Sequence, residues 1–400
     1  MKSFFLNHIL PIGFAIALVI SGLLWLNSNA TQSEAKEPKL IKGTQNKFKG
    51  RYTNFSSEGD QDELNYMASI ANKKQLTLFG SSEFCALPSV TYNFFPDSLN
   101  RQVLGIGHAY HQELSILVEL MAAHEFNENS EICIFISPEW FKNFGGTNTA
   151  AFIEFATQNF LSRIYNDSLI PDEYKSYIGE YIHTNSDDFE GLTPVMKQLN
   201  DLYLNNSSNN PITNANNFLK TNVVNHIIKT EIQSIEYRPI LKYNEIKIWK
   251  GDYNQTAKTL QDSFVSKIKD NNLFIYDDYY NKYLLDDEGN GRRYRIQAID
   301  LETSIEYKDF KVLMKYIKSR NMKASFVIIP FNPYYYYGTE TLAPLMDSLT
   351  TTFEKNDFSY LNLYSNDTTN YEPGTLKDVM HLGEYGWMKV NQFIDSIYYK

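Results

Sequence analysis

Residues 76–84 read Leu-Thr-Leu-Phe-Gly-Ser-Ser-Glu-Phe, and this stretch decides the fold. Leu76 to Phe79 form strands readily, and Gly80 tolerates the close backbone approach of a sharp strand-to-helix turn. A serine just past such a turn lies at the carboxyl end of a parallel strand, where the N–H groups of a helix N-terminus can face a developing oxyanion. Ser82 is therefore a candidate nucleophile. A strand that ends in an ordinary serine N-cap is the alternative.

Composition indicates a large globular protein and argues against one class of partner. The 400 residues, 43% of them hydrophobic, suit one large α/β domain with insertions or two domains. Acidic residues outnumber basic residues by 47 to 37, for a formal net charge of -10, and no basic stripe is visible. A nucleic-acid partner is therefore not expected, because phosphates need cations to neutralise them. The 29 tyrosines suit grooves that bind sugars or polymers, although many must be core residues.

An apolar run near the N-terminus predicts a membrane anchor. Residues 9–26 carry no charge and are long enough to span a bilayer, and Lys2 precedes them. By the positive-inside rule the N-terminus is cytoplasmic and the main body extracytoplasmic, in a single-pass protein of the cell membrane. We expect an uncleaved anchor over residues 1–26, a polar linker over residues 27–49 and the domain over residues 50–400. A cleavable signal peptide ending near Ser28-Asn29-Ala30 is the alternative.

A strand–helix–strand pattern follows the Gly-Ser-Ser turn. A glycine-containing strand over residues 102–108 precedes a helix that begins near His111, in which apolar residues recur at helical spacing. Residues 132–136, Ile-Cys-Ile-Phe-Ile, then form an apolar strand of the kind that is buried on both faces. This order predicts a βαβ unit with a right-handed parallel crossover. Ser137-Pro-Glu-Trp-Phe comes next, where open α/β sheets bind their ligands.

A helical block interrupts this pattern before it returns. Residues 150–275 contain amphipathic segments, including 151–165 and 171–183, and are interpreted as a helical insertion or a small subdomain. Residues 276–295 are rich in Asp, Tyr and Arg, and are expected as surface loops near a cleft or as a solvated face. The whole pattern predicts an α/β fold with a mostly parallel sheet. The later elements expected are a helix with a Thr303–Glu306 capping box, strands over 324–329 and 360–364, and a final helix over 385–398.

A second candidate group lies just before the final helix. Asp378 and His381 are three residues apart, so one irregular turn lets the carboxylate reach the imidazole Nδ1 while Nε2 faces a cleft. A general base for a serine needs such an arrangement, and Ser, Asp, His is one convergent order of a catalytic triad. Gly105 and Gly107 follow the neighbouring strand and could supply oxyanion donors. A solvated Asp beside a half-buried His is the alternative.

Cysteine and histidine spacing predicts no metal site. Cys85 and Cys133 form no Cys-x-x-Cys pair, so two buried free thiols are expected, with a disulfide as the alternative if the domain is extracytoplasmic. His108 and His111 flank the glycine loop without an evident third ligand. We interpret them as capping or cleft-lining residues.

Three motifs together resemble the DltD family, the membrane-anchored D-alanyl transfer proteins of teichoic-acid biosynthesis. They are Gly-Ser-Ser-Glu after the first strand, Ser-Pro-Glu-Trp-Phe after a later one, and Asp-Val-Met-His-Leu-Gly-Glu-Tyr-Gly-Trp at residues 378–387. The spacing of these blocks, the length and the apolar N-terminus agree over essentially the whole chain. The resemblance implies a fold similar to SGNH hydrolases, a three-layer α/β/α sandwich.

The resemblance also implies residue roles. Ser82 corresponds to the nucleophile, and Asp378 and His381 to the acid and the base. The Ser82 N–H and Gly107 are the expected oxyanion donors. Four residues are expected to bind substrate, namely Ser81, Glu83, Glu139 and Trp140. The stretch that begins at Ser137 lacks the oxyanion-hole asparagine usual in those hydrolases, so this part of the site is expected to differ.

The function that the resemblance implies is transfer of D-alanine to a teichoic-acid-type polymer without a cofactor. Its expected partners are the membrane, a membrane O-acyltransferase, an acyl carrier and the polymer. Two alternatives stay open: an esterase, thioesterase or O-acyltransferase acting on another surface glycan, and a non-catalytic member that binds polymer or membrane partners.

Overall fold

The computed structural model describes residues 21, 51–54, 76–84, 103–107, 109–142, 146–156, 158–185, 194–206, 242–245, 253–269, 271–285 and 293–398. Nearly all of the predicted anchor, the linker, Cys85 and His108 lie outside these residues. Among the described residues, no helix combines the length and the apolar character that crossing a membrane requires.

The centre of the fold is a parallel sheet of five described strands. Its spatial order is β3-β2-β4-β7-β9, and every neighbouring pair is parallel. The chain forms β2 first, adds β3 on one side and then continues on the other side with β4, as in doubly wound folds. The strand order therefore reverses between β2 and β4, where such sheets bind ligands at their carboxyl ends. The strands are β2 (Leu76–Gly80), β3 (Val103–Gly107), β4 (Glu131–Ile136), β7 (Lys323–Ile328) and β9 (Ser359–Asn362).

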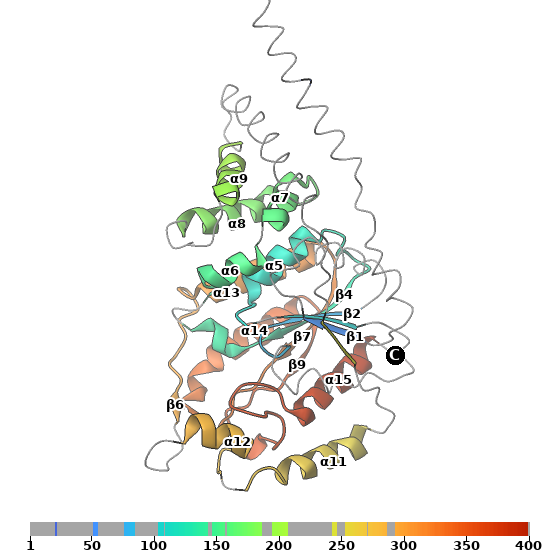
Figure 1. The fold of residues 1–400 in the computed structure, drawn as a ribbon, viewed down its shortest axis with the longest axis vertical. Helices are drawn as coiled ribbons and strands as arrows, with labels where there is room; N and C mark the ends of the chain where they lie inside the picture. The colour runs from blue at the N-terminus through green and yellow to red at the C-terminus, as the bar shows by residue number, and fades with distance from the viewer. Residues whose placement is uncertain are drawn as a thin grey trace, which may run out of the picture.

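Helices cover both faces of this sheet, so the predicted α/β fold with a mostly parallel sheet is confirmed (Figure 1). Side chains alternate along each strand and supply two separate cores. In β4, Ile132 and Ile134 pack toward the helices α5, α13 and α14, whereas Cys133 and Phe135 pack toward α15. The covering helices are α5 (Glu113–Ala122), α13 (Ile305–Ser319), α14 (Ala343–Lys355) and α15 (Glu384–Tyr398).

Between β4 and β7 the described chain adds helices and the two short strands β5 and β6; β1 precedes β2, and β8 follows β7. The segment predicted as one helix over 151–165 is two helices, α6 and α7. The short strand β5 pairs antiparallel with β1, and β6 pairs with β8. The bounds are α6 (Thr149–Phe155), α7 (Gln158–Asn166), α8 (Asp172–Thr184), α9 (Pro194–Asn206), α11 (Tyr253–Val265), α12 (Asp277–Tyr279), β1 (Arg51–Asn54), β5 (Lys242–Glu245), β6 (Tyr294–Arg295) and β8 (Tyr336–Tyr337).

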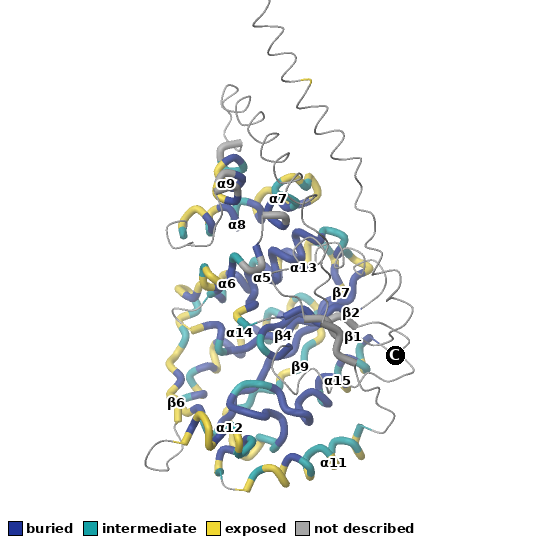
Figure 2. Tube along the Cα trace, in the orientation of Figure 1, coloured by how far each residue is buried: buried dark blue, intermediate teal, exposed yellow. Residues whose placement is uncertain are grey.

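Helix α5 is buried over its whole length (Figure 2). The sheet covers one of its sides, and α6, α7 and α13 pack on the others. An all-round apolar helix is expected in such a place. Its two glutamates, Glu113 and Glu119, are buried as well, so each needs a partner inside the protein.

The N-terminus of α13 corrects one prediction. The N-cap is Ser304, not Thr303: Ser304 Oγ accepts the Tyr307 N–H at 3.2 Å. Glu306 does not reach back to its own cap. Its Oε1 instead accepts the Glu113 N–H of α5 at 3.1 Å, which satisfies a free donor in the first turn of a buried helix.

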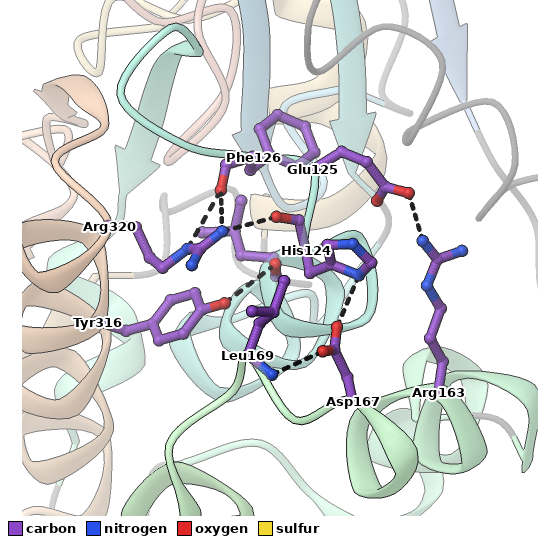
Figure 3. Close-up of polar contacts among 9 residues, drawn as sticks. His124, Glu125, Phe126, Arg163, Asp167, Leu169, Tyr316 and Arg320 are labelled. Atoms are coloured by element: carbon purple, nitrogen blue, oxygen red, sulfur yellow. Dashed lines mark hydrogen bonds and ion pairs between the residues drawn. The ribbon is translucent and has the colours of Figure 1, made fainter.

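A polar cluster joins helix α7 and the residues after it to the core at the C-terminal end of α5 (Figure 3). Arg320 Nη2 donates to the carbonyls of His124 at 2.8 Å and Phe126 at 3.4 Å. His124 Nδ1 lies 2.7 Å from Asp167 Oδ2. Arg163 of α7 forms an ion pair with Glu125. Helix α5 runs antiparallel to the strands. This cluster therefore lies at the amino-terminal ends of the strands, whereas the Ser82 turn lies at their carboxyl ends.

Candidate active site

The Gly-Ser-Ser turn begins where β2 ends. The Phe84 N–H donates to the Ser81 carbonyl at 3.1 Å, which closes a tight turn around Ser82. Ser82 is half-buried, whereas the strand residues before it are buried. The turn thus presents the Ser82 hydroxyl at the carboxyl end of β2, beside the point where the strand order reverses.

Gly107 packs directly against this turn. It pairs with Gly80 in the β2–β3 register, and a Cβ placed on it would lie 2.5 Å from the Gly80 carbonyl oxygen. Only glycine permits that approach. This packing explains why a glycine stands at the position, and the role of Gly107 as an oxyanion donor stays a prediction.

A short hairpin-like loop brings Asp378 and His381 together. Leu376 and Leu382 form an isolated antiparallel bridge, and the Lys377 N–H donates to the His381 carbonyl at 3.0 Å. Inside this loop, Asp378 Oδ1 accepts the N–H groups of Met380 at 3.0 Å and His381 at 2.8 Å. An aspartate that caps the next residues in this way sets a tight turn.

The loop places His381 between Asp378 and Ser82. His381 Nδ1 lies 2.8 Å from Asp378 Oδ2, and His381 Nε2 lies 2.9 Å from Ser82 Oγ. An ionised carboxylate only accepts, so Nδ1 carries the proton and the Nε2 lone pair is left to accept the Ser82 hydroxyl. A general base for a serine needs this tautomer.

Electrostatics strengthen the acid–base pair. Burial opposes the charge on Asp378, but hydrogen bonding and attraction to His381, with the two backbone donors, lower its pKa overall. Burial likewise opposes the imidazolium, but the hydrogen bond and the charge of Asp378, together with the charge of Glu83, raise the pKa of His381 overall. The surroundings therefore stabilise the protonated form of the His381 imidazole.

Glu83 lies beneath the turn rather than on its surface. It is 4% exposed, and its Oε2 accepts the Ser81 N–H at 2.8 Å. Burial raises the pKa of this carboxyl, while backbone donors and His381 oppose the increase. Glu83 thus holds the turn and places an acidic group near His381.

The other residues expected to bind substrate follow the carboxyl ends of β2 and β4. Ser81 is buried in the turn, and Trp140 is 7% exposed and belongs to the core on the α5 side. Glu139 is half-buried, pairs with Lys142 and lines a cavity of about 300 Å³ together with Tyr294 and other residues. Their roles in substrate binding stay predictions.

The stretch Pro138–Phe141 forms a short 3-10 helix at the end of β4. Ser137, the first residue of the stretch that lacks an oxyanion-hole asparagine, caps this helix: its Oγ accepts the Glu139 N–H at 3.3 Å. The side chain therefore has a local structural partner.

Tyr279 lies near Asp378, and the sequence did not single it out. Burial, and then the negative charge of Asp378, raise the pKa of its phenol to about 12. Tyr279 ends α12, within the stretch 276–295 that the sequence predicted as surface loops near a cleft or as a solvated face. The structure forms α12 here and continues it with a π-helical turn over Tyr280–Leu284, so the loop prediction is wrong for these residues.

Thiols and metal ligands do not form a second centre in the described part of the chain. Cys133 is free, and burial raises the pKa of its thiol to about 12, so it is an inert core residue. No group of three or more His, Cys, Asp and Glu side chains among the described residues could hold a metal ion.

Comparison with known proteins agrees with these motifs. The sequence model of a family described as DltD protein matches residues 52–399. "Protein DltD" of Bacillus subtilis (strain 168) is 22% identical, over 96% of this chain and 94% of the relative. "Protein DltD" of Staphylococcus aureus (strain NCTC 8325 / PS 47) is 20% identical, over 81% of each chain. On the extent of the family match, this chain belongs to the DltD family.

Proposed function

We propose that the protein is a serine acyltransferase that moves a D-alanyl group through an acyl-enzyme on Ser82 to a teichoic-acid-type polymer. The observation that carries the proposal is the continuous contact from Asp378 through His381 to Ser82 Oγ. Membership of the DltD family, which is implicated in D-alanylation of teichoic acids, supports the acyl group and the acceptor.

In the first half-reaction Ser82 Oγ attacks the carbonyl carbon of an activated D-alanyl ester or thioester. His381 Nε2 takes the hydroxyl proton as the new C–O bond forms, and Asp378 stabilises the imidazolium through Nδ1–H. The tetrahedral intermediate then collapses. The bond to the donor's oxygen or sulfur breaks, and that atom takes the proton from Nε2.

In the second half-reaction a polymer hydroxyl attacks the D-alanyl ester on Ser82. His381 Nε2 removes the hydroxyl proton, the polymer ester forms, and Ser82 Oγ leaves with that proton returned to it. No cofactor is required, since protons and the acyl group balance between donor, enzyme and acceptor. Water in place of the polymer hydroxyl would make the same site an esterase or thioesterase.

We further propose that the domain is held at the outer face of the cytoplasmic membrane by residues 1–26. The uncharged run over residues 9–26 supports this placement. There, the domain would receive D-alanyl groups from a membrane O-acyltransferase and an acyl carrier.

The test uses the full chain in detergent, a radiolabelled D-alanyl thioester and purified lipoteichoic acid. We expect label on the polymer with the wild-type chain and none above background with Ser82→Ala. Ser396→Ala, which removes an exposed hydroxyl of α15, is the control and should transfer normally. Release of D-alanine to water at one rate with and without polymer would replace the transferase by a hydrolase. Full transfer by Ser82→Ala would overturn the mechanism.

A further inference from the structure

A second histidine–carboxylate pair lies directly beneath the Ser82 turn. His111 Nδ1 is 2.7 Å from the Gly80 carbonyl oxygen, and His111 Nε2 is 3.0 Å from Glu119 Oε2. The side chains are 0% and 1% exposed. His111 precedes α5 and Glu119 lies within it, so the pair joins the buried helix to the last residue of β2.

The partners of His111 settle which ring nitrogen carries a proton. A backbone carbonyl only accepts, so Nδ1 must be an N–H that donates to Gly80. On the other side, Nε2–H donates to a Glu119 carboxylate, or an Nε2 lone pair accepts from a Glu119 carboxylic acid. Both forms contain two protons in total and both keep the donor on Gly80. A neutral imidazole protonated on Nε2 alone is excluded, because two lone pairs would then meet at 2.7 Å.

The backbone of Gly80 is tightly packed on more than one side. A Cβ on Gly107 would lie 2.5 Å from the Gly80 carbonyl oxygen, and a Cβ on Gly80 itself would collide with the Phe84 ring. Two residues after Gly80, Ser82 Oγ must lie within hydrogen-bond distance of His381 Nε2, and it lies at 2.9 Å. A rotation of the Gly80 peptide would therefore shift the nucleophile.

We propose that His111 and Glu119 are positioning residues for Ser82, with His111 anchoring the Gly80 carbonyl and Glu119 holding the His111 ring in place through Nε2. This inference rests on the proposed function of Ser82, but it concerns residues that do not touch the reacting atoms. Buried partners that orient a side chain carrying the chemistry commonly have a large effect on rate.

The kinetic test measures how fast a fluorophosphonate labels Ser82 in the full chain. His111→Leu should lower the maximal labelling rate about 10²-fold with little change in reagent affinity, because a small misplacement of a reacting group has that effect. His111→Asn retains an N–H donor near the Nδ1 position and should recover most of the rate. Glu119→Gln can donate to Nε2 and should label almost normally, whereas Glu119→Leu should not.

Tyr398→Phe is the matched control for a lost buried hydrogen bond. The Tyr398 hydroxyl donates to the Ile132 carbonyl of β4 at 2.7 Å, on the other face of the sheet. We expect this variant to lose stability but to label at the wild-type rate. Equal rates for His111→Leu and the wild type, or equal losses in His111→Leu, His111→Asn and Tyr398→Phe, would overturn the positioning role.

A spectroscopic readout separates this inference from the proposed function. In Ser82→Ala protein with ¹⁵N-labelled histidines, long-range ¹H–¹⁵N spectra should show a protonated Nδ1 for His111 at neutral pH. An unprotonated Nδ1 would overturn the inference even in a protein that labels normally. Conversely, a wild-type chain that no fluorophosphonate labels would overturn the function proposed for Ser82 while leaving this hydrogen bond testable.

Discussion

At the scale of single residues, Asp378 uses its two oxygens for different tasks. Oδ1 accepts the backbone donors that shape the loop, and Oδ2 accepts from the ring of His381. One carboxylate therefore sets the position of the His381 ring and its tautomer. This double use explains how residues 378–381 can supply both of the side chains that the proposed mechanism uses as acid and base.

Asp378→Asn tests this double role. The amide can still accept backbone N–H groups through its oxygen, but its NH₂ group facing His381 favours the imidazole with its proton on Nε2. That tautomer cannot accept the Ser82 hydroxyl, so we expect fluorophosphonate labelling to fall about 10³- to 10⁴-fold. Circular dichroism should show a folded protein. A rate within tenfold of wild type would contradict the assigned tautomer.

The pH dependence of labelling reports on His381. Only the neutral imidazole accepts the Ser82 proton, so labelling should fall as pH drops through the pKa of His381, which is raised above its ordinary value of about 6.5. Part of this increase comes from the charge of Glu83. In Glu83→Gln, which retains an acceptor for the Ser81 N–H, the acidic limb should move to lower pH. An unmoved limb would show that Glu83 is uncharged in this range.

At the scale of elements, the contact between α5 and α13 buries several acids. Glu306 accepts the Glu113 N–H, and Tyr177 of α8 donates to Asp309 Oδ1 at 2.5 Å. Burial raises the pKa of Glu113 to about 7, and burial with mutual repulsion raises those of Glu306 and Asp309. These acids are held at the start of both helices, where their neutral forms avoid the cost of a buried charge.

Stability should therefore decrease as the solution becomes more basic. In the unfolded chain a glutamate ionises near its ordinary value of about 4.5, but in the fold Glu113 holds its proton to about 7. The stability that this difference contributes is therefore fully present below the pKa of the unfolded chain, and it is lost as the pH rises through the pKa of the folded protein. Urea unfolding should show a loss on the order of 1–3 kcal/mol between pH 5 and pH 8.

Glu306→Gln should reduce this slope. The glutamine oxygen can still accept the Glu113 N–H, while one of the two repelling carboxyls is removed. At pH 8 the variant should be more stable than the wild type, and at pH 5 the two should be close. A wild-type slope in the variant would show that these carboxyls do not interact.

At the scale of the whole molecule, the candidate site lies at the carboxyl ends of the strands, and the polar cluster of Figure 3 lies at their amino-terminal ends. The cluster joins α7 to the loop after α5 and to the end of α13. Helix α7 is thereby attached away from the site. Its attachment is expected to contribute to stability and not to the chemistry.

Arg320→Met tests this separation. It removes charged donors to the carbonyls of His124 and Phe126, so we expect a loss of about 1.5–3 kcal/mol in the free energy of unfolding. Fluorophosphonate labelling of Ser82 at 25 °C should be unchanged. Lys315→Met, which breaks an exposed ion pair with Glu173, should destabilise less. A labelling defect in Arg320→Met would show that the polar cluster and the candidate site are coupled.

Local patterns predicted most of the central elements. The apolar runs of β4 and β7 and the stripes of α13 and α15 lie within a few residues of their predicted positions. The misses were local choices that packing decided. Ser304 caps α13 in place of Thr303 because the Glu306 carboxylate serves the N-terminus of α5.

The sequence by itself determined the fold class, the Gly-Ser-Ser turn and the Asp-x-x-His loop, because strand periodicity, glycine tolerance and aspartate capping act over a few residues. Only the tertiary structure decided that Ser82 and His381, 299 positions apart, meet at 2.9 Å. It also decided that His111 and Glu119 lie beneath the same turn. Such contacts depend on strand order and on which buried polar groups can satisfy one another, and neither leaves a periodic signal in the chain.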